Sequence, residues 1–490
     1  MKLSEILNGI DCNILQGKEL DVADIAFDSR KVHKGTMFVA QRGVHVDGHH
    51  YIADAVGQGA VAIMCEEAPQ TLHKGVTYIV VGNSDVALGL AASNYYGNPC
   101  RQLRLVGITG TNGKTTTVTL LHRLWRNAGK HAGLLSTIVN RVDDEELPAT
   151  HTTPDALELN ALLRKMVDHG CEACFMEVSS HSIVQHRIAG LTFAGAIFSN
   201  ITHDHLDFHK TMSNYIAAKK AFFDGLDKKA FALTNLDDKN GMVMVQNTKA
   251  AVKTYSLLHP ADFKCKVLED SFQGLHLEMS IADTASKPQQ VWCKLVGRFN
   301  AQNLTAIFGT ACLMGMKSDE ALVGISHLDP AEGRFQHVRG KGIDAIVDYA
   351  HTPDALQNVI DTINEVRQRY QRLIVVVGCG GDRDPLKRPE MAKIAVESSD
   401  RVILTSDNPR TEDPDSILDD MEKSLTDEER TKSVRITDRR SAIRAAVMMA
   451  KEGDIILVAG KGHEKYQEVN GVRHHFDDRE ELNNLLSSSQ

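Results

Sequence analysis

The sequence lacks the features of an exported or membrane-bound protein. Residues 1–7 carry an acidic residue, Glu5, where a signal peptide would have a basic segment followed by an apolar core. No stretch approaches the roughly 18 consecutive apolar residues that a membrane-spanning helix needs. We therefore expect a soluble, cytoplasmic protein that does not insert into a membrane.

Excess positive charge and paired cysteines are also missing. The formal net charge of -9 argues against a broad nucleic-acid surface, which needs clustered Lys and Arg to replace counterions along phosphates. Among the nine cysteines only Cys171 and Cys174 are close, and no second pair completes a zinc site, so we interpret them as reduced strand residues. Bound phosphates should then belong to small molecules.

The 490 residues are too many for one hydrophobic core and predict about three domains. The breaker Gly97-Asn98-Pro99 and the pair Asp329-Pro330 divide the chain into residues 1–98, 99–330 and 331–490. The first region mixes turns with short strands, for example at residues 35–40 and 60–64. The expected class is α/β throughout.

Strands alternate with helices in the second and third regions. In the second, strands expected at 103–109, 173–178, 194–199 and 231–234 alternate with helices at 115–127, 155–168, 213–226 and 301–314, which predicts a mostly parallel sheet like that of P-loop ATPases. In the third, strands at 345–348, 373–377, 402–405 and 455–458 alternate with helices from Pro353, Pro389 and Ser416. This pattern predicts a doubly wound, Rossmann-like domain whose ligands bind beyond the carboxyl ends of the strands.

A glycine-rich loop, Gly110-Thr111-Asn112-Gly113-Lys114-Thr115-Thr116, follows an apolar strand and opens a helix. Its backbone N–H groups and the helix dipole can converge on phosphate oxygens. Lys114 would neutralise the β and γ phosphates, and Thr115 would offer its hydroxyl to Mg²⁺. The loop is shortened, because Ile108 stands where the common motif has its first glycine.

Two further strands end in groups that can bind a metal. Glu177 closes one strand, and His205 follows another in the run Asn200-Ile201-Thr202-His203-Asp204-His205-Leu206-Asp207. Together they favour a nucleotide-bound Mg²⁺, which tolerates one histidine among oxygen ligands. A zinc site formed by His203, His205 and His209 is the alternative. From spacing alone, Lys219 and Lys220 are ordinary helix lysines.

The order of short motifs along the whole chain resembles that of the Mur ligase family. Any one of these motifs is weak, whereas their joint order is specific. The runs that carry the resemblance, besides the glycine-rich loop, are Asp28-Ser29-Arg30, Gly43 to Gly48, His151-Thr152-Thr153-Pro154, Glu177-Val178-Ser179-Ser180-His181, Asp204-His205-Leu206-Asp207, Ala217-Ala218-Lys219, Gly297-Arg298-Phe299-Asn300, Glu332-Gly333-Arg334-Phe335, Asp348-Tyr349-Ala350-His351-Thr352-Pro353, Gly380-Gly381-Asp382-Arg383, Asp407-Asn408-Pro409-Arg410 and Gly460-Lys461-Gly462-His463-Glu464.

The resemblance implies an ATP-dependent ligase of peptidoglycan precursor synthesis. Such an enzyme adds meso-diaminopimelate to the D-glutamate γ-carboxylate of UDP-N-acetylmuramoyl-L-alanyl-D-glutamate through an acyl phosphate. It also implies ATP, Mg²⁺ and a CO₂ adduct on Lys219, which turns the ammonium into an anionic oxygen ligand for the metal. We expect a monomer.

The resemblance also assigns roles to individual residues. Lys114, Glu177, His205 and Lys219 would be catalytic, and Thr115, Glu177, His205 and carbamylated Lys219 would hold metal. ATP would contact Gly110, Thr111, Asn112, Gly113, Lys114, Thr115, Thr116, Asn300, Asn303, Arg334, Asp348 and His351. The UDP-muramoyl dipeptide would contact Phe27, Ser29, Val44, His45, Val46, His151, Thr152, Thr153, Ser179, Gln185 and Arg187. Diaminopimelate would contact Arg383, Asp407, Asn408, Pro409, Arg410, Gly460 and Glu464.

Other interpretations of the function remain open. The lysine-adding ligase of the same step is the main alternative, with the ligase of the next step and folylpolyglutamate synthase behind it. Arg410 disfavours them because its guanidinium can pair with a second carboxylate on the amino acid, although it also fits an ordinary turn bounded by proline. From another class, a nucleotide-binding regulatory module without catalysis would not need Lys114, Glu177, His205 and Lys219 together.

Overall fold

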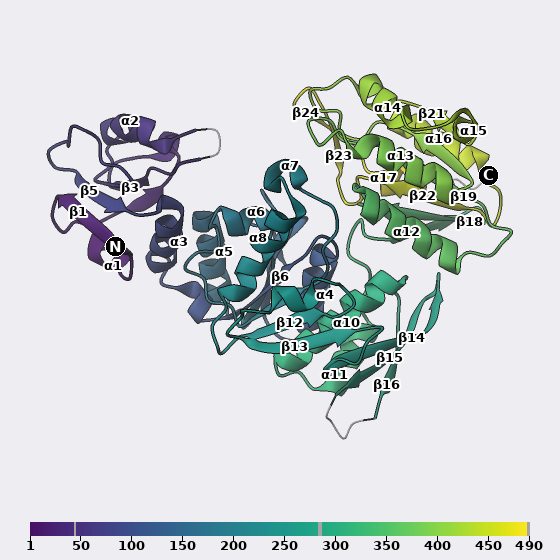
Figure 1. Cartoon of the computed structure of the whole chain (residues 1–490), viewed down its shortest axis with the longest axis horizontal. Helices are drawn as coiled ribbons and strands as arrows, with labels where there is room; N and C mark the ends of the chain where they lie inside the picture. Colours follow the sequence, from purple (N-terminus) through teal and green to yellow (C-terminus); the bar gives the residue numbers. More distant parts are fainter. Residues whose placement is uncertain (44–45, 283–286, 488–490) are drawn as a thin grey trace.

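The computed structural model describes residues 1–43, 46–282 and 287–487, and most of its strands lie in three large sheets. Figure 1 shows the N-terminal sheet and the C-terminal sheet on opposite sides of the central one. Helices cover each sheet, so the predicted α/β class with a mostly parallel central sheet is confirmed. No helix in the described ranges combines the length and apolar character needed to cross a membrane.

The first sheet has five strands in the order β1-β5-β4-β3-β2, all parallel except β1. The strands predicted at 35–40 and 60–64 correspond to β3 and β4. Its elements are α1 (Leu3–Ile6), β1 (Cys12–Gln16), β2 (Asp24–Ala26), β3 (Thr36–Val39), α2 (Ile52–Gly57), β4 (Ala62–Cys65), β5 (Thr77–Val81) and α3 (Ser84–Tyr95). Helix α3 starts at Asn83, whose side chain accepts a hydrogen bond from the Val86 N–H, as an N-cap residue does.

The central sheet has eleven strands in the order β16-β15-β14-β13-β12-β11-β6-β10-β7-β8-β9. Its middle is parallel, and antiparallel strands extend both edges. The sequence patterns did not predict these extensions. The strands are β6 (Arg104–Thr109), β7 (Ala132–Leu135), β8 (Val139–Val142), β9 (Glu145–Pro148), β10 (Ala173–Glu177), β11 (Gly195–Phe198), β12 (Phe231–Asn235), β13 (Ala251–Ser256), β14 (Phe263–Ser271), β15 (Gly274–Ile281) and β16 (Gln289–Cys293).

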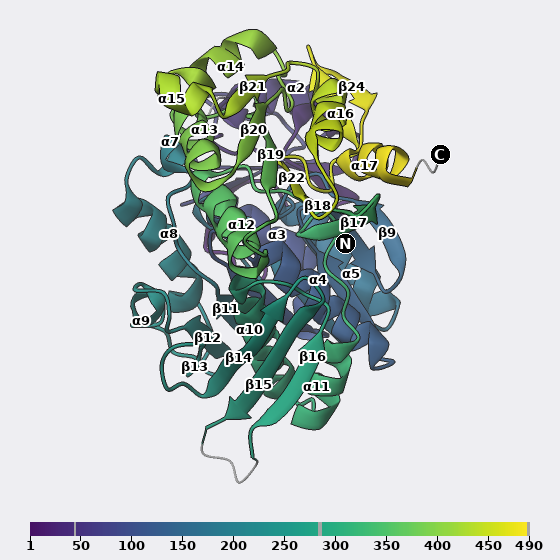
Figure 2. The same cartoon turned by 90° about the vertical axis from the view of Figure 1, so that its right-hand side faces the viewer.

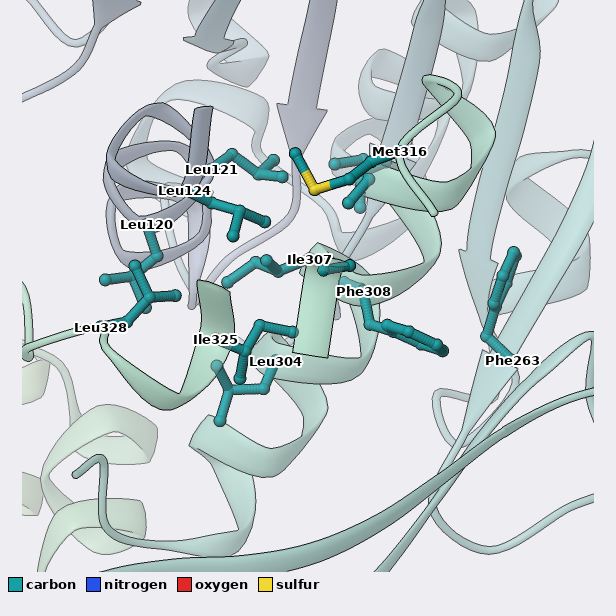
Figure 3. Packing of buried hydrophobic residues seen from close by; sticks show 14 of the residues in the cluster. Leu120, Leu121, Leu124, Phe263, Leu304, Ile307, Phe308, Met316, Ile325 and Leu328 are labelled. Atoms are coloured by element: carbon teal, nitrogen blue, oxygen red, sulfur yellow. The ribbon is translucent and has the colours of Figure 1, made fainter. Parts of the chain in front are cut away.

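The helices around this sheet bury its two faces. They are α4 (Lys114–Asn127), α5 (Ala156–Asp168), α6 (Ser180–Val184), α7 (Leu206–His209), α8 (Met212–Asp224), α9 (Gly241–Met244), α10 (Arg298–Leu313) and α11 (Ser318–Ser326). Helix α4 presents Leu120, Leu121 and Leu124 to α10 and α11, an apolar stripe with the i, i+1, i+4 spacing of an amphipathic helix. Figure 3 shows these leucines facing Leu304, Ile307 and Ile325.

The other face of α4 reaches the connection between the central and C-terminal sheets. The Arg123 guanidinium donates hydrogen bonds from Nη1 to the backbone oxygens of Asp329 at 2.8 Å and Pro330 at 3.0 Å. Asp329 also pairs with Lys294. The helix that begins at the glycine-rich loop is therefore tied directly to the chain segment that leads into the third sheet.

The third sheet has six strands in the order β17-β18-β22-β19-β20-β21, parallel except for β17. Figure 2 shows α12, α13 and α14 on one face of it and α16 and α17 on the other, which is a doubly wound arrangement. Its strands are β17 (Gln336–Gly340), β18 (Ile343–Asp348), β19 (Leu373–Val377), β20 (Arg401–Leu404), β21 (Ser433–Arg435) and β22 (Ile455–Ala459). A separate hairpin, β23 (Tyr466–Val469) and β24 (Val472–His475), follows β22.

Two helices here begin earlier than predicted. The helices are α12 (Pro353–Val366), α13 (Lys387–Ser398), α14 (Pro414–Glu422), α15 (Asp427–Arg430), α16 (Arg439–Met449) and α17 (Asp478–Ser487). Pro389 lies in the first turn of α13, where its missing N–H breaks no helical hydrogen bond, so the helix begins before it. Helix α14 begins at Pro414, because the Asp413 side chain caps it.

Candidate active site

The glycine-rich loop lies at the carboxyl edge of the central sheet, between β6 and α4. Ile108 is a buried residue of β6 paired with both β10 and β11, so the strand occupies the position of the missing first glycine. The end of β11 then holds the loop: Asn200 Oδ1 accepts from the Asn112 N–H at 2.9 Å, and Ser199 Oγ donates to the Asn112 oxygen at 2.6 Å. The loop is preorganised by its neighbour strand.

Gly113 is required at the start of α4. Its φ of 85° lies in the left-handed region, and a Cβ there would come within 2.4 Å of Asn303 Oδ1. Asn303 in turn donates to Asn300 Oδ1 at 3.2 Å, and Asn300 donates to the Val296 oxygen. Asn303 lines a cavity beside the loop, whereas Asn300 lies buried behind it and supports it.

Lys114 bends back over its own loop. Its Nζ donates to the oxygens of Gly110 at 2.9 Å and Thr111 at 2.8 Å. Burial lowers the pKa of Lys114 from its usual value, and the charges of Glu177 and Asp204 oppose that shift. The ammonium has no carboxylate ion pair among the described residues, which leaves its charge available to an anion.

Glu177 connects three segments at the end of β10. Its Oε1 accepts hydrogen bonds from Thr115 Oγ1 and from the Thr137 N–H, both at 2.8 Å. Its backbone oxygen accepts from Thr153 Oγ1 at 2.8 Å. The predicted neighbourhood of Glu177 and Thr115 therefore exists, and it provides two oxygen atoms at the wall of one cavity.

Lys219 and Lys220, adjacent on α8, have opposite environments. Lys220 forms an ordinary ion pair with Asp224 at 2.6 Å. Lys219 is 1% exposed, and its Nζ donates to the Gly110 oxygen at 2.8 Å and to Thr109 Oγ1 at 3.4 Å, at the root of the glycine-rich loop. Burial, and next the charge of Lys114, shift the pKa of Lys219 well below its usual value. Lys219 is thus no ordinary helix lysine.

The histidines predicted near the metal are spread over the cavity rather than gathered. His205 has a positive φ of 53° and lies with its ring centroid 5.0 Å from that of His181, whereas His209 is buried and contacts Ser180 Oγ at 2.9 Å. Within the described ranges, no three His, Cys, Asp or Glu side chains are arranged to hold a metal. A metal at this site would need oxygen ligands from a bound nucleotide.

The C-terminal sheet contributes to the same cavity. Arg334 Nη2 lies 3.4 Å from Thr115 Oγ1, and Asp354 at the start of α12 accepts a 2.7 Å hydrogen bond from the Asn112 side chain. Asp348 is buried behind Arg334 and accepts from the Phe335 and Ala350 N–H groups, and its burial raises its pKa. A cavity of about 170 Å³ is lined by the loop, Glu177, His205, Lys219, Arg334 and His351.

A second cavity of about 400 Å³ opens beyond the carboxyl ends of β19, β20 and β22. It shares His205 and His351 with the first, so the two adjoin. Six of the seven residues predicted to bind the amino acid line it, and Pro409 does not. The six are Arg383, Asp407, Asn408, Arg410, Gly460 and Glu464.

Arg410 is held in an unusual conformation. Its φ is 53°, which few residues other than glycine adopt, and strained positions of this kind concentrate at functional sites. The hairpin of β23 and β24 fixes it: the Arg410 N–H donates to the Glu468 oxygen, and the Asn470 N–H donates to the Arg410 oxygen. Its Nη1 donates to the Gly381 oxygen at 2.6 Å. These contacts favour a binding role over an ordinary proline-bounded turn.

The same cavity is bordered by a connected set of polar side chains. Asn408 donates to Glu464 Oε2 at 2.7 Å, and the buried Lys461 donates to Asn408 Oδ1 at 2.9 Å and to Glu464 at 3.1 Å. Burial and then the charge of Asp407 raise the pKa of Glu464, and Lys461 opposes that effect. The same cavity is thus lined by the cations of Arg383 and Arg410 and by the carboxylates of Asp407 and Glu464.

The residues predicted to hold the muramoyl-peptide end lie beside Glu177. Thr137 Oγ1 donates to Thr152 Oγ1 at 3.1 Å, Arg187 Nη1 donates to the Thr153 oxygen at 2.9 Å, and Ser179 caps α6. His151 is exposed, and Gln185 is half-buried. After Arg187 the chain packs on α3 of the first sheet, where a Cβ on Gly89 would contact the Ala189 oxygen.

On the first sheet, Phe27 follows β2, Ser29 begins a short 3-10 helix, and Val46 is exposed. Val44 and His45, also predicted there, lie outside the described residues. The structure adds residues that the sequence patterns did not single out: Asn200, Thr137, Asp354, Lys461 and Arg439. Asn200 and Lys461 lie inside quoted runs without an assigned role, whereas Thr137, Asp354 and Arg439 had no sequence signal.

A glycine-rich loop between a strand and a helix, beside two adjoining polar cavities, is typical of a nucleotide-dependent enzyme, here built on three α/β sheets. Family models agree along the chain: the Mur ligase family, catalytic domain matches residues 21–96, the Mur ligase middle domain residues 108–311, and the Mur ligase, glutamate ligase domain residues 333–462. The chain belongs to the Mur ligase family and is a ligase.

Individual relatives cover the whole length. The chain is 53% identical over 490 residues to the UDP-N-acetylmuramoyl-L-alanyl-D-glutamate--2,6-diaminopimelate ligase of Phocaeicola vulgatus, covering 100% of both. The protein of the same name from Cytophaga hutchinsonii is 52% identical, covering 100% of this chain and 99% of that one. A solved structure of a ligase with this name is 33% identical, with a TM-score of 0.68 and 95% of each chain covered. A folylpolyglutamate synthase from Mycobacterium tuberculosis, 15% identical with a TM-score of 0.62 over 76% of this chain and 92% of that one, shares the fold alone.

Proposed function

We propose that this ligase adds meso-diaminopimelate to the γ-carboxylate of D-glutamate in UDP-N-acetylmuramoyl-L-alanyl-D-glutamate, with hydrolysis of ATP to ADP and phosphate. The observation that carries the proposal is the pair of adjoining cavities. Lys114 of the phosphate loop lines one cavity, and Arg410 and Glu464 both line the other. The full-length relatives at 52–53% identity are ligases named for the same two substrates.

The phosphate loop prepares the carboxylate. A carboxylate is a poor acylating agent, so its oxygen first takes the γ-phosphoryl group of ATP and ADP leaves. Lys114 and the loop N–H groups counter the negative charge that develops on the transferred group. The amine of the amino acid then attacks the acyl phosphate, and phosphate is expelled. Arg334, which reaches Thr115 from the third sheet, and Asp354, which holds Asn112, keep that sheet over the reactants and exclude water.

The oxygen donors at the cavity wall fit Mg²⁺. Thr115, Glu177 and His205 would hold it together with the nucleotide, and when bound it supplies positive charge beside the phosphate oxygens. An unmodified Lys219 does not fit as a ligand, because its ammonium would repel a cation. Within the described chain it pairs with no carboxylate, so conversion of Lys219 to a carbamate by CO₂ would replace a buried positive charge by an anionic oxygen ligand.

The UDP-muramoyl dipeptide would bridge the first two sheets. We assign the uridine end to Phe27, Ser29 and the segment with Val46, and the peptide end to Thr152, Thr153, Ser179 and Arg187. The support is the packing of α3 on the chain that follows Arg187. We also place the reaction in the cytoplasm, where ATP is made, and expect the monomer to be the active unit.

The second cavity selects the amino acid. Meso-diaminopimelate differs from lysine by a carboxylate on the distal carbon, and Arg410, with Arg383 nearby, can pair with it. Asn408 and Glu464 would receive the distal ammonium. Lysine would leave the Arg410 guanidinium without its partner, and an unpaired charge in a partly buried site costs a few kcal/mol. In a lysine-adding ligase, the amino acid would have no distal carboxylate for Arg410 to pair with.

The assay that tests this function combines purified protein, the UDP-muramoyl dipeptide, ATP and one diamino acid at a time. We expect kcat/KM for meso-diaminopimelate to exceed that for L-lysine by roughly 10² or more, since ~1.4 kcal/mol corresponds to a factor of ten. Product mass and phosphate release are the measurements. Equal use of L-lysine would refute the specificity but leave the ligase assignment, whereas no phosphate release with any diamino acid would refute both.

Arg410→Ala should lower kcat/KM for meso-diaminopimelate by about 10²-fold, because the substrate's distal carboxylate would lose its partner. The KM values for ATP and the dipeptide should stay within about twofold. Arg473→Ala is the matched control: Arg473 lies on the hairpin that holds the Arg410 backbone, but its side chain is mostly exposed and pairs with Glu468. Equal losses in the two variants would contradict the role of Arg410.

A further inference from the structure

A buried arginine that no part of the proposed mechanism uses lies behind the amino-acid cavity. Arg439 is the first residue of α16 and is 0% exposed. Its Nε and Nη2 donate to the two carboxylate oxygens of Asp478 at 2.8 and 2.7 Å, and Nη2 also donates to the Ala459 oxygen at 3.0 Å. The guanidinium therefore connects the start of α16, the start of α17 and the end of β22.

The remaining nitrogen of Arg439 is turned to the cavity side. Nη1 is buried and has no hydrogen-bond partner among the described residues, and it lies 4.0 Å from Asp407 Oδ2. A buried N–H group without an acceptor is uncommon, because its desolvation is not compensated. Among the described residues, Asp407 and Asp478 are the two carboxylates within ion-pair distance of the Arg439 guanidinium.

Asp407 itself lines the amino-acid cavity, where Glu464 is its neighbour. Two carboxylates in one partly buried cavity repel each other, and the repulsion favours protonation of one of them. Lys461 faces Glu464 at 3.1 Å, and Arg439 faces Asp407. Each cavity carboxylate thus has its own buried cation on the protein side, which leaves its other side free for a ligand.

The close packing around Asp407 makes its position sensitive. A Cβ on Gly460 would come within 2.6 Å of Asp407 Oδ2, and Asp407 Oδ1 accepts a 2.7 Å hydrogen bond from the Asn408 N–H. Asp407 therefore fixes the backbone of Asn408, whose side chain contacts Glu464. A shift of Asp407 would be passed to the other residues of this wall.

We propose that Arg439 is a positioning residue for the amino-acid cavity: anchored by Asp478, its guanidinium holds the Asp407 side chain in place, so that the wall formed by Asp407, Asn408 and Glu464 receives the ammonium group of the diamino acid. The inference rests on the proposed function of this cavity. Arg439 does not touch the substrate, and it acts through Asp407.

The main test is Arg439→Gln/Asp478→Asn, which removes the buried charges as a pair and keeps two hydrogen-bonding side chains. Loss of both partners of a buried ion pair is tolerated far better than loss of one, so the sheet should fold. KM for meso-diaminopimelate should rise at least about tenfold, while KM for ATP and for the dipeptide stays within about twofold. An unchanged KM for meso-diaminopimelate, or an equal rise for all three substrates, would overturn the proposal.

Two further variants separate positioning from general stability. Arg372→Gln/Asp454→Asn removes an ion pair at the opposite ends of the same strands, β19 and β22, and should lower the melting temperature without changing KM for meso-diaminopimelate. Asp407→Asn should raise that KM by itself, and adding Arg439→Gln/Asp478→Asn to it should raise it little further, since both act through one group. Additive increases would show that Arg439 does not act through Asp407.

If the Arg439→Gln/Asp478→Asn variant does not fold, Arg439→Lys tests the proposal instead. Lysine keeps the ion pair with Asp478 but has no atom in place of Nη1, so KM for meso-diaminopimelate should still rise about threefold or more. A wild-type KM in this variant would overturn the proposal. The wild-type enzyme is assayed beside every variant: its failure to use meso-diaminopimelate would refute the proposed function, whereas an active wild type with unaffected variants would refute only the role of Arg439.

Discussion

Lys114→Ala should reduce ligation by at least about 10³-fold, because it removes the one ammonium that the glycine-rich loop places where phosphoryl transfer develops negative charge. Among the described residues, its Nζ donates hydrogen bonds to two backbone oxygens of its own loop and to no other group, so the fold should survive. ADP formation in the presence of dipeptide and meso-diaminopimelate measures the loss.

The controls for Lys114→Ala are two properties that should not change. The melting temperature and the affinity for the UDP-muramoyl dipeptide should stay close to those of the wild type, because neither depends on the Lys114 ammonium. A variant that folds, binds the dipeptide and still turns over at a near wild-type rate would show that the phosphate loop has been assigned wrongly. Loss of dipeptide binding would instead point to a structural role for Lys114.

Lys219→Ala should be nearly inactive, with a loss of about 10²-fold or more, and millimolar acetate should restore part of the activity. The reason is that the missing group would be an anionic oxygen ligand, which a small carboxylate can imitate and a small amine cannot. Phosphate release with and without acetate is the measurement, and methylamine serves as the negative control.

Lys220→Ala is the matched variant on the same helix, since Lys220 pairs with Asp224 and Lys219 does not. It should keep its activity within about twofold, because this half-buried i,i+4 ion pair lies within α8 and contributes little. Mass spectrometry of the native enzyme under CO₂ should also find the carbamate mass on the peptide with Lys219. An active, Mg²⁺-bound crystal with an unmodified Lys219 ammonium would rule out the carbamate.

Local patterns were enough to predict the parts of the site that come from consecutive residues. The strand before Gly110, the loop and the helix after it are encoded within a few residues, so the sequence predicts all three. The end of β10 at Glu177 follows equally from an apolar run. The different environments of Lys219 and Lys220 do not, because α8 places both in the same local pattern and only the tertiary packing buries one of them.

Contacts between residues far apart in the sequence escaped the sequence patterns, even where one of the two residues was predicted. Asn408 and Lys461 are 53 residues apart, and Arg439 and Asp478 are 39 residues apart, so their contacts depend on the order of β20, β22 and β19 in the sheet. The antiparallel strands at both edges of the central sheet were missed for the same reason. Short alternating runs pair only where a neighbouring edge is available.

Helix α4 and the contact between Asn112 and Asp354 make nucleotide affinity and the placement of the third sheet thermodynamically inseparable. Lys114 begins this helix. Arg123, about two and a half turns further along, donates hydrogen bonds to the backbone oxygens of Asp329 and Pro330. If a bound nucleotide stabilises the docked position of the third sheet, docking of that sheet must strengthen nucleotide binding by the same free energy. A ligand confined to the amino-acid cavity is therefore, by this reciprocity, an effector of the phosphate loop as well.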